Sequence, residues 1–140
     1  MLTTHSIGLA EAERVIAAAI AKAKEINVPQ NIAVVDAFGH LVAFGRMDGA
    51  KFLSIDIATA KAVTAAGARK ATADILPATQ PGQPGFGIQN LNNGRFTTLG
   101  GGIPLVSGDE VVGAVGVSSG SVAEDLVVAQ AAADAFHLSE

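Results

Sequence analysis

The stretch from Arg95 to Phe136, RFTTLGGGIPLVSGDEVVGAVGVSSGSVAEDLVVAQAAADAF, predicts a strand, a turn, a second strand and a helix in succession. Residues 103–106 form a short apolar run, residues 107–110 carry turn-forming side chains, and residues 111–119 alternate as a strand does. Ser121 and Glu124 occupy the first and fourth positions of a capping box, which marks the start of a helix. The pattern therefore predicts an antiparallel hairpin that runs directly into a helix.

The first half of the chain predicts a helix, a second hairpin and a second helix. Over residues 9–26, apolar side chains recur at spacings of three and four, which is the period of an amphipathic helix. Residues 31–38 and 41–47 read as the two strands of a hairpin. Residues 52–71 are rich in alanine and apolar around most of the helix circumference, so this helix needs a partner surface on the sheet or on another subunit.

The order of these elements favours an α+β fold. Hairpins alternate with helices, unlike the strand-helix alternation of a parallel sheet, so we expect an antiparallel β-sheet of about five strands flanked by helices. We expect one domain, residues 1–140, because this length suits a single core. Residues 77–94 carry three prolines and four glycines, and such a long connection is either functional or a passive connector.

Composition disfavours several classes of partner. A net charge of −4 without a basic run disfavours nucleic-acid binding, which depends on clustered Lys and Arg. No run of 18 apolar residues occurs, so we expect no membrane span. The absence of cysteine excludes disulfides and thiolate chemistry and fits a cytoplasmic protein.

Two long motifs resemble the GlcG/HbpS-like, haem-degrading domain family, which is related to the C-terminal domain of PduO-type corrinoid adenosyltransferases. They are LGGGIPLVSGDEVVGAVGVSSGSVAEDLVVAQAA at residues 99–132 and AVVDAFGHLVAFGRMDGAKFLSIDIATAKAVTAA at residues 33–66. The resemblance implies a profilin-like layer fold with a central antiparallel sheet. It also implies a homo-oligomer, from dimer to octamer, that binds haem or another tetrapyrrole and is able to degrade haem.

The resemblance further implies a haem pocket at a subunit interface, bordered by residues 9–26, the 77–94 loop and the glycine run. Some haem-binding relatives use a histidine on the first helix as axial ligand, but residues 9–26 of this chain contain none. The candidate axial ligands here are therefore Met47, at the end of a strand, and His5, near the N-terminus.

A run of three glycines and one aromatic residue are the candidate ligand contacts. The run Gly100-Gly101-Gly102 either exposes its backbone to a carboxylate or phosphate, or forms a bulged entry to the next strand. Phe86, in the 77–94 loop, is the aromatic candidate.

The charged residues suggest an alternative, an enzyme of tautomerase or deaminase type that acts on a small carboxylate-bearing metabolite. Arg46 could hold the carboxylate through two hydrogen bonds, and Lys61, Asp36 or Glu124 could move protons. Each of these residues could equally be a surface charge or part of an ion pair, and Glu124 could serve only the capping box. A third reading is an assembly or signalling protein without a ligand, because the Ala-rich helix needs a partner surface.

Overall fold

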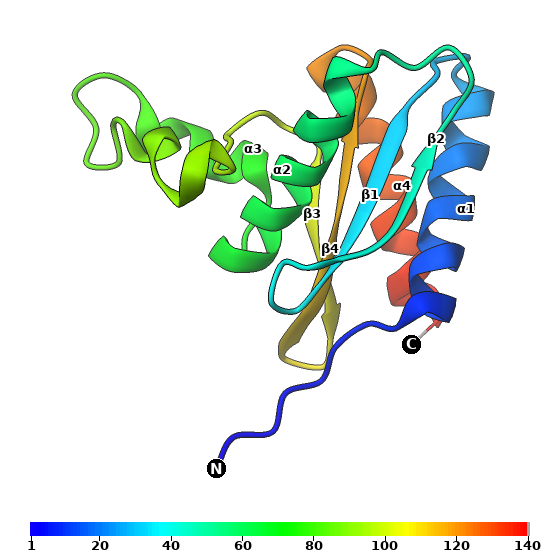
Figure 1. The fold of residues 1–140 in the computed structure, drawn as a ribbon, viewed down its shortest axis with the longest axis horizontal. Coiled ribbons are helices and arrows are strands. Elements are labelled where there is room, and N and C mark those ends of the chain that lie inside the picture. The colour runs from blue at the N-terminus through cyan, green and yellow to red at the C-terminus, as the bar shows by residue number, and fades with distance from the viewer. Residues whose placement is uncertain (140) are drawn as a thin grey trace.

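The computed structural model describes residues 1–139 and places one antiparallel sheet between two helical layers (Figure 1). In chain order the elements are α1 (Leu9–Glu25), β1 (Asn31–Asp36), β2 (Leu41–Arg46), α2 (Leu53–Ala68), α3 (Thr72–Ile75), three 3₁₀ turns (Leu76–Thr79, Ile88–Asn90 and Asn92–Gly94), β3 (Gly102–Ser107), β4 (Glu110–Ser118) and α4 (Val122–Ser139). Within residues 1–139, none of the helices has the length and apolar character needed to span a membrane.

The predicted hairpins form the whole sheet, whose strand order is β2-β1-β4-β3 with every neighbouring pair antiparallel. The α+β prediction is confirmed, but the expected count of about five strands is wrong, because the sheet of the described chain has four. Each hairpin supplies two strands, and the Pro- and Gly-rich segment between them folds into 3₁₀ turns instead of a fifth strand.

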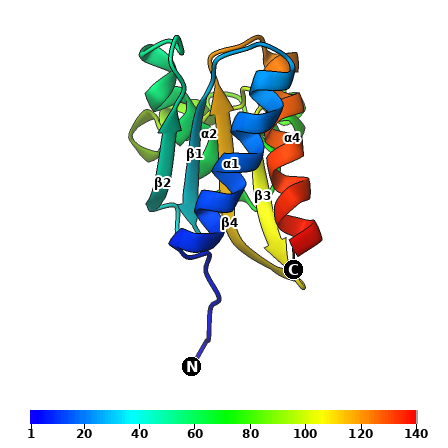
Figure 2. The same ribbon diagram turned by 90° about the vertical axis from the view of Figure 1, so that its right-hand side faces the viewer.

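Helices α1 and α4 lie side by side on one face of the sheet (Figure 2). They cover a continuous core to which β1 contributes Ile32 and Val34 and β4 contributes Val115 and Val117. Val112 joins this core although simple alternation would turn it to the opposite face. A bulge explains the change, because Leu105 pairs with Gly113 while Val106 pairs with Val111, which leaves Val112 as the extra residue.

Helix α2 covers the other face and approaches the sheet very closely. The contact surface is made of small side chains, among them Ala33 and Ala114 from the sheet and Ala58 and Ala62 from the helix. At Gly116 of β4, an added Cβ would overlap the carbonyl oxygen of Ala58. The Ala-rich helix therefore finds its partner surface on the sheet of its own chain.

Residues 76–94 project away from the sheet beyond α2 and α3, as the green segment on the left of Figure 1 shows. We call this segment the arm. It includes the whole of the predicted 77–94 loop and contains three 3₁₀ turns.

Candidate functional site

Two of the predicted site residues, Arg46 and Met47, lie in one surface hollow of about 380 Å³. Arg46 is the last residue of edge strand β2, and Met47 follows it. Helix α1 supplies the facing wall with Ile20 and Lys24, and Asp48 completes the lining. Gly45 allows the helix to lie close, since a Cβ at this position would be only 3.1 Å from Ile16. The hollow is thus formed by the packing of α1 against β2.

The chemistry of this hollow combines two cations, Lys24 and Arg46, and one carboxylate, Asp48, with a soft thioether. Within residues 1–139, neither Lys24 nor Arg46 takes part in an ion pair, so both cations are free to meet an anion. Met47 is partly buried against the core below α1, and its backbone NH donates to the carbonyl of Gln30 at 3.0 Å. The arrangement can hold a carboxylate beside an apolar group, and it offers one sulfur ligand to a soft metal.

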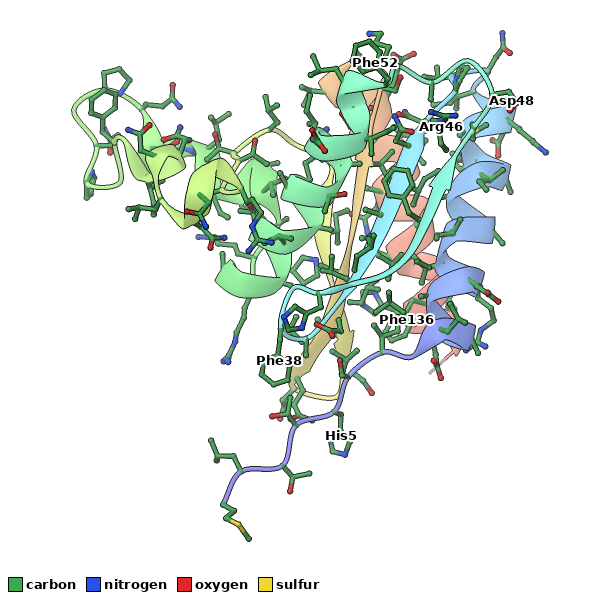
Figure 3. The ribbon with its side chains drawn as sticks, viewed as in Figure 1. His5, Phe38, Arg46, Asp48, Phe52 and Phe136 are labelled. Atoms are coloured by element: carbon green, nitrogen blue, oxygen red, sulfur yellow. The ribbon has the colours of Figure 1, made fainter. Side chains whose placement is uncertain are left out.

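The second predicted axial ligand, His5, lies at the opposite end of the molecule. Figure 3 shows His5 below the sheet and Arg46 with Asp48 at its upper end. The Nδ1 atom of His5 is 2.6 Å from Oε2 of Glu110, which holds the ring against the β3–β4 turn. His5 and Met47 therefore cannot ligate the same iron within one subunit.

Lys61, the first of the predicted proton-transfer residues, is buried on α2, and its ammonium group makes two hydrogen bonds. Its Nζ donates to Oδ2 of Asp125 and to the carbonyl oxygen of Val117, both at 2.8 Å. Burial lowers the pKa of the Lys61 ammonium from its ordinary value, while the Asp125 carboxylate opposes this change. The pair ties α2 to α4 across the end of the sheet.

The other two predicted proton-transfer residues serve as local caps. Asp36 ends β1, and its Oδ1 accepts from the backbone NH groups of Phe38 and His40, which shapes the hairpin turn. Glu124 accepts from the backbone NH of Ser121 at 2.8 Å, and Ser121 Oγ accepts from the NH of Glu124 at 3.2 Å. Hydrogen bonding from Ser121 to the Glu124 carboxylate, mainly from the Ser121 backbone NH, lowers the pKa of the Glu124 carboxyl. The structure does not bring Arg46, Asp36, Lys61 and Glu124 together.

The glycine run lies in a tightly packed part of the fold, and all three residues are buried. An added Cβ would lie 2.9 Å from Val122 at Gly100 and 2.7 Å from the carbonyl oxygen of Val117 at Gly101, and at Gly102 it would overlap the carbonyl oxygen of Lys61. The run thus lets the chain enter β3 between α2 and α4. Contact between these glycines and a ligand stays a prediction.

Phe86 lies in the arm with 67% of its surface exposed. The arm and α1 stand on opposite sides of the sheet (Figure 1), so the α1 hollow and Phe86 cannot line one pocket within a subunit. The expectation that residues 9–26, the 77–94 loop and the glycine run border one pocket would therefore require surfaces from different subunits.

The sequence analysis did not identify Lys24, which lines the hollow between α1 and β2, or Asp125, which pairs with Lys61. Lys24 belongs to the polar part of the α1 pattern, and only the packing of α1 against β2 places it beside Arg46. Asp125 follows Glu124 directly, and the capping-box spacing pointed to Glu124 alone. The position of Asp125 in the first turn of a largely buried helix was the sequence feature that could have identified it as the partner of Lys61.

Residues 7–134 match the family model described as haem degrading protein HbpS-like. A protein of Citrobacter freundii, described as an uncharacterised 15.0 kDa protein in the dhaT-dhaS intergenic region, is 44% identical over 131 residues, covering 94% of this chain and 92% of that protein.

Two solved structures are similar over nearly their whole length. Klebsiella pneumoniae protein ORFY superposes with a TM-score of 0.95 at 41% identity, covering 98% of this chain and 94% of that one. A complex of PduOC with haem superposes with a TM-score of 0.89 at 32% identity, covering 93% of this chain and 94% of that one.

Proposed function

The chain belongs to the HbpS-like family, and from this premise we propose that it binds haem in the hollow between α1 and β2. The observation that carries the proposal is the meeting of Met47 with the unpaired cations Lys24 and Arg46 in one hollow. The likeness to the haem complex of PduOC supports the choice of ligand.

The residues of the hollow fit one edge of a haem group. Lys24 and Arg46 would pair with propionate carboxylates, Ile20 would contact the ring, and the Met47 thioether would offer an axial ligand to the iron. Bound haem supplies an iron centre capable of electron transfer and dioxygen chemistry. A hollow of about 380 Å³ is at the small end for such a ligand, so a second surface would cover the rest of the ring.

Titration with haemin, followed at the Soret band, tests the proposal. We expect saturable binding in which Met47→Ala changes the position of the Soret band. Arg46→Gln and Lys24→Gln should weaken binding roughly 2–5-fold each, as expected for ion pairs open to solvent. Lys70→Gln is the matched control, because Lys70 is an exposed cation that follows α2 on the other face of the sheet. A non-saturable response, or variants of the hollow that behave as the parent does, would exclude this site.

We extend the proposal to haem degradation, since the matching family model carries that description. The reaction consumes dioxygen and electrons from a reductant, so ascorbate in air is a suitable assay. The Soret absorbance of the bound haem should decline with time in the parent protein and more slowly in Met47→Ala. A spectrum that persists under these conditions would limit the function to binding.

The alternative reading, an enzyme for a small carboxylate-bearing metabolite, keeps Arg46 as its anchor. Its predicted proton-transfer residues are dispersed over the molecule, so no observation favours it over haem binding. A thermal shift on addition of small carboxylic acids, lost in Arg46→Gln, would favour it instead.

The assembly and the location complete the proposal. We expect a homo-oligomer between a dimer and an octamer, and the need for a second surface over the hollow supports this expectation. A cytoplasmic location is supported by the absence of cysteine, and cell fractionation tests it.

A further inference from the structure

The arm, residues 76–94, is unusual in composition for a segment that projects into solvent. Its sequence, LPATQPGQPGFGIQNLNNG, contains no Asp, Glu, Lys, Arg or His, although 16% of the whole chain is charged. A segment of this length would carry about three charges at that average. Its polar side chains are almost all amides.

The arm also exposes large apolar side chains. Leu76, Phe86 and Leu91 have 43%, 67% and 62% of their surfaces exposed. Phe86 and Leu91 border an open hollow of about 310 Å³ whose other walls come from Pro84, Gly85, Gly87 and Ile88. The exposed Phe86 ring thus forms one wall of a shallow, open recess on this short segment. Such surfaces typically mark contacts with another molecule.

The fold of the arm is fixed by its own hydrogen bonds. The NH of Gly85 donates to the carbonyl of Ala78 at 2.8 Å, which closes the segment on itself, and a Cβ at Gly85 would be 2.8 Å from the same oxygen. The NH of Leu91 donates to the carbonyl of Ile88 at 3.0 Å. A preformed segment loses little conformational entropy on binding, so the arm is suited to act as a docking surface.

We infer that the arm is a self-association surface, through which two copies of this chain pair arm to arm about a twofold axis. In such an interface each patch meets itself, so a charged side chain near the axis would face its own like charge. The arm has none. Amide side chains both donate and accept, so they can pair with their own copies, and the Phe86 ring of one arm can enter the recess of the other. This inference rests on the proposed homo-oligomer and does not depend on haem.

Charged substitutions in the arm test the inference. The double variant Phe86→Asp with Leu91→Asp places like charges opposite each other across the proposed axis. We expect the dissociation constant of the dimer to rise at least about 100-fold by sedimentation velocity, with an unchanged circular dichroism spectrum at 25 °C. Phe38→Asp is the control, since Phe38 is equally exposed but lies on the β1–β2 turn. A monomeric parent protein, or a double variant that associates as the parent does, would overturn the inference.

Single cysteines report the pairing directly, because the chain contains no cysteine of its own. Gln83→Cys lies in the arm, and Ala17→Cys lies on the exposed side of α1. A short bismaleimide should link two Gln83→Cys chains efficiently and Ala17→Cys chains poorly. An associated protein without this preference would exclude arm-to-arm pairing. Haem titration of the same variants separates arm-to-arm pairing from haem binding. Dimers that do not bind haem would refute only the proposed haem site.

Discussion

At the scale of single residues, Lys61 and Asp125 form a buried ion pair that joins α2 to α4. The sequence left proton transfer, a surface charge or an ion pair open for Lys61, and in the structure 1% of the residue is exposed. The proposed proton transfer, however, needs access to a ligand, and Nζ already binds Asp125 and Val117. A lysine enclosed in this way acts first as a link between α2 and α4.

We expect Lys61→Met to lower the free energy of unfolding by about 3–5 kcal/mol, because the carboxylate of Asp125 would stay buried without its partner. Urea unfolding measures the loss. In the double variant Lys61→Met with Asp125→Asn, the amide oxygen can still accept from the NH of Gly120, and more than half of the loss should be recovered. A single variant that costs less than about 1 kcal/mol would contradict this account.

At the scale of elements, the contact between α2 and the sheet depends on glycines, which have no side chain. Gly116 and Gly102 leave room for the backbone of α2, which is why this Ala-rich helix can lie close against β3 and β4. The alanine content of residues 52–71 predicted a partner surface, but the pattern could not say whether that surface was the sheet or another subunit. Only the structure showed how closely the backbone of α2 approaches the sheet.

Two glycines, Gly116 inside this contact and Gly67 on the exposed side of α2, should respond in opposite directions to replacement by alanine. Gly116→Ala forces a methyl group against the backbone of α2 and should destabilise the protein by about 3 kcal/mol. Gly67, in the last turn of α2, has open space around it, so Gly67→Ala should stabilise by about 0.4–1 kcal/mol through the unfolded chain. Thermal melts of the two variants compare them directly, and losses of equal size would refute the proposed close contact.

The start of α4 provides a pH-dependent contribution to stability. The hydrogen bonds from Ser121 lower the folded-state pKa of Glu124 below its unfolded value near 4.5. A carboxyl group whose pKa is lowered by folding stabilises the folded state at pH values above its unfolded-state pKa. This stabilisation is lost as the pH falls through the folded-state pKa. The parent should therefore be more stable than Glu124→Gln at pH 7, and the difference should vanish below the lowered pKa.

Chemical unfolding of the parent and Glu124→Gln between pH 7 and pH 2 measures this difference. Glu13→Gln serves as the control, because Glu13 is an exposed acid on α1. A parent-to-variant difference that stays constant over this range would rule out the charged capping bond as its source.

At the scale of the whole molecule, the sequence predicted the helices and strands far better than the contacts between them. Both hairpins and three long helices follow from local spacing, because the periods of two and of about 3.6 are properties of the chain itself. The meeting of Lys24 with Met47 depends on β2 being an edge strand beneath α1, which no local pattern encodes. The separation of His5 and Phe86 from this hollow has the same origin, since distance along the chain does not fix the face of the sheet.

The close approach of α2 also bears on how the protein can be remodelled. On the α2 face of the sheet, positions such as Gly102 and Gly116 cannot accept another carbon atom, so a protein engineer would find that face closed to redesign. On the α1 and α4 face, branched side chains such as Val115, Val117 and Ile32 fill the space, and compensating exchanges of volume are available there. New binding specificity would therefore be easiest to introduce beneath α1, beside the hollow that already holds Arg46 and Met47.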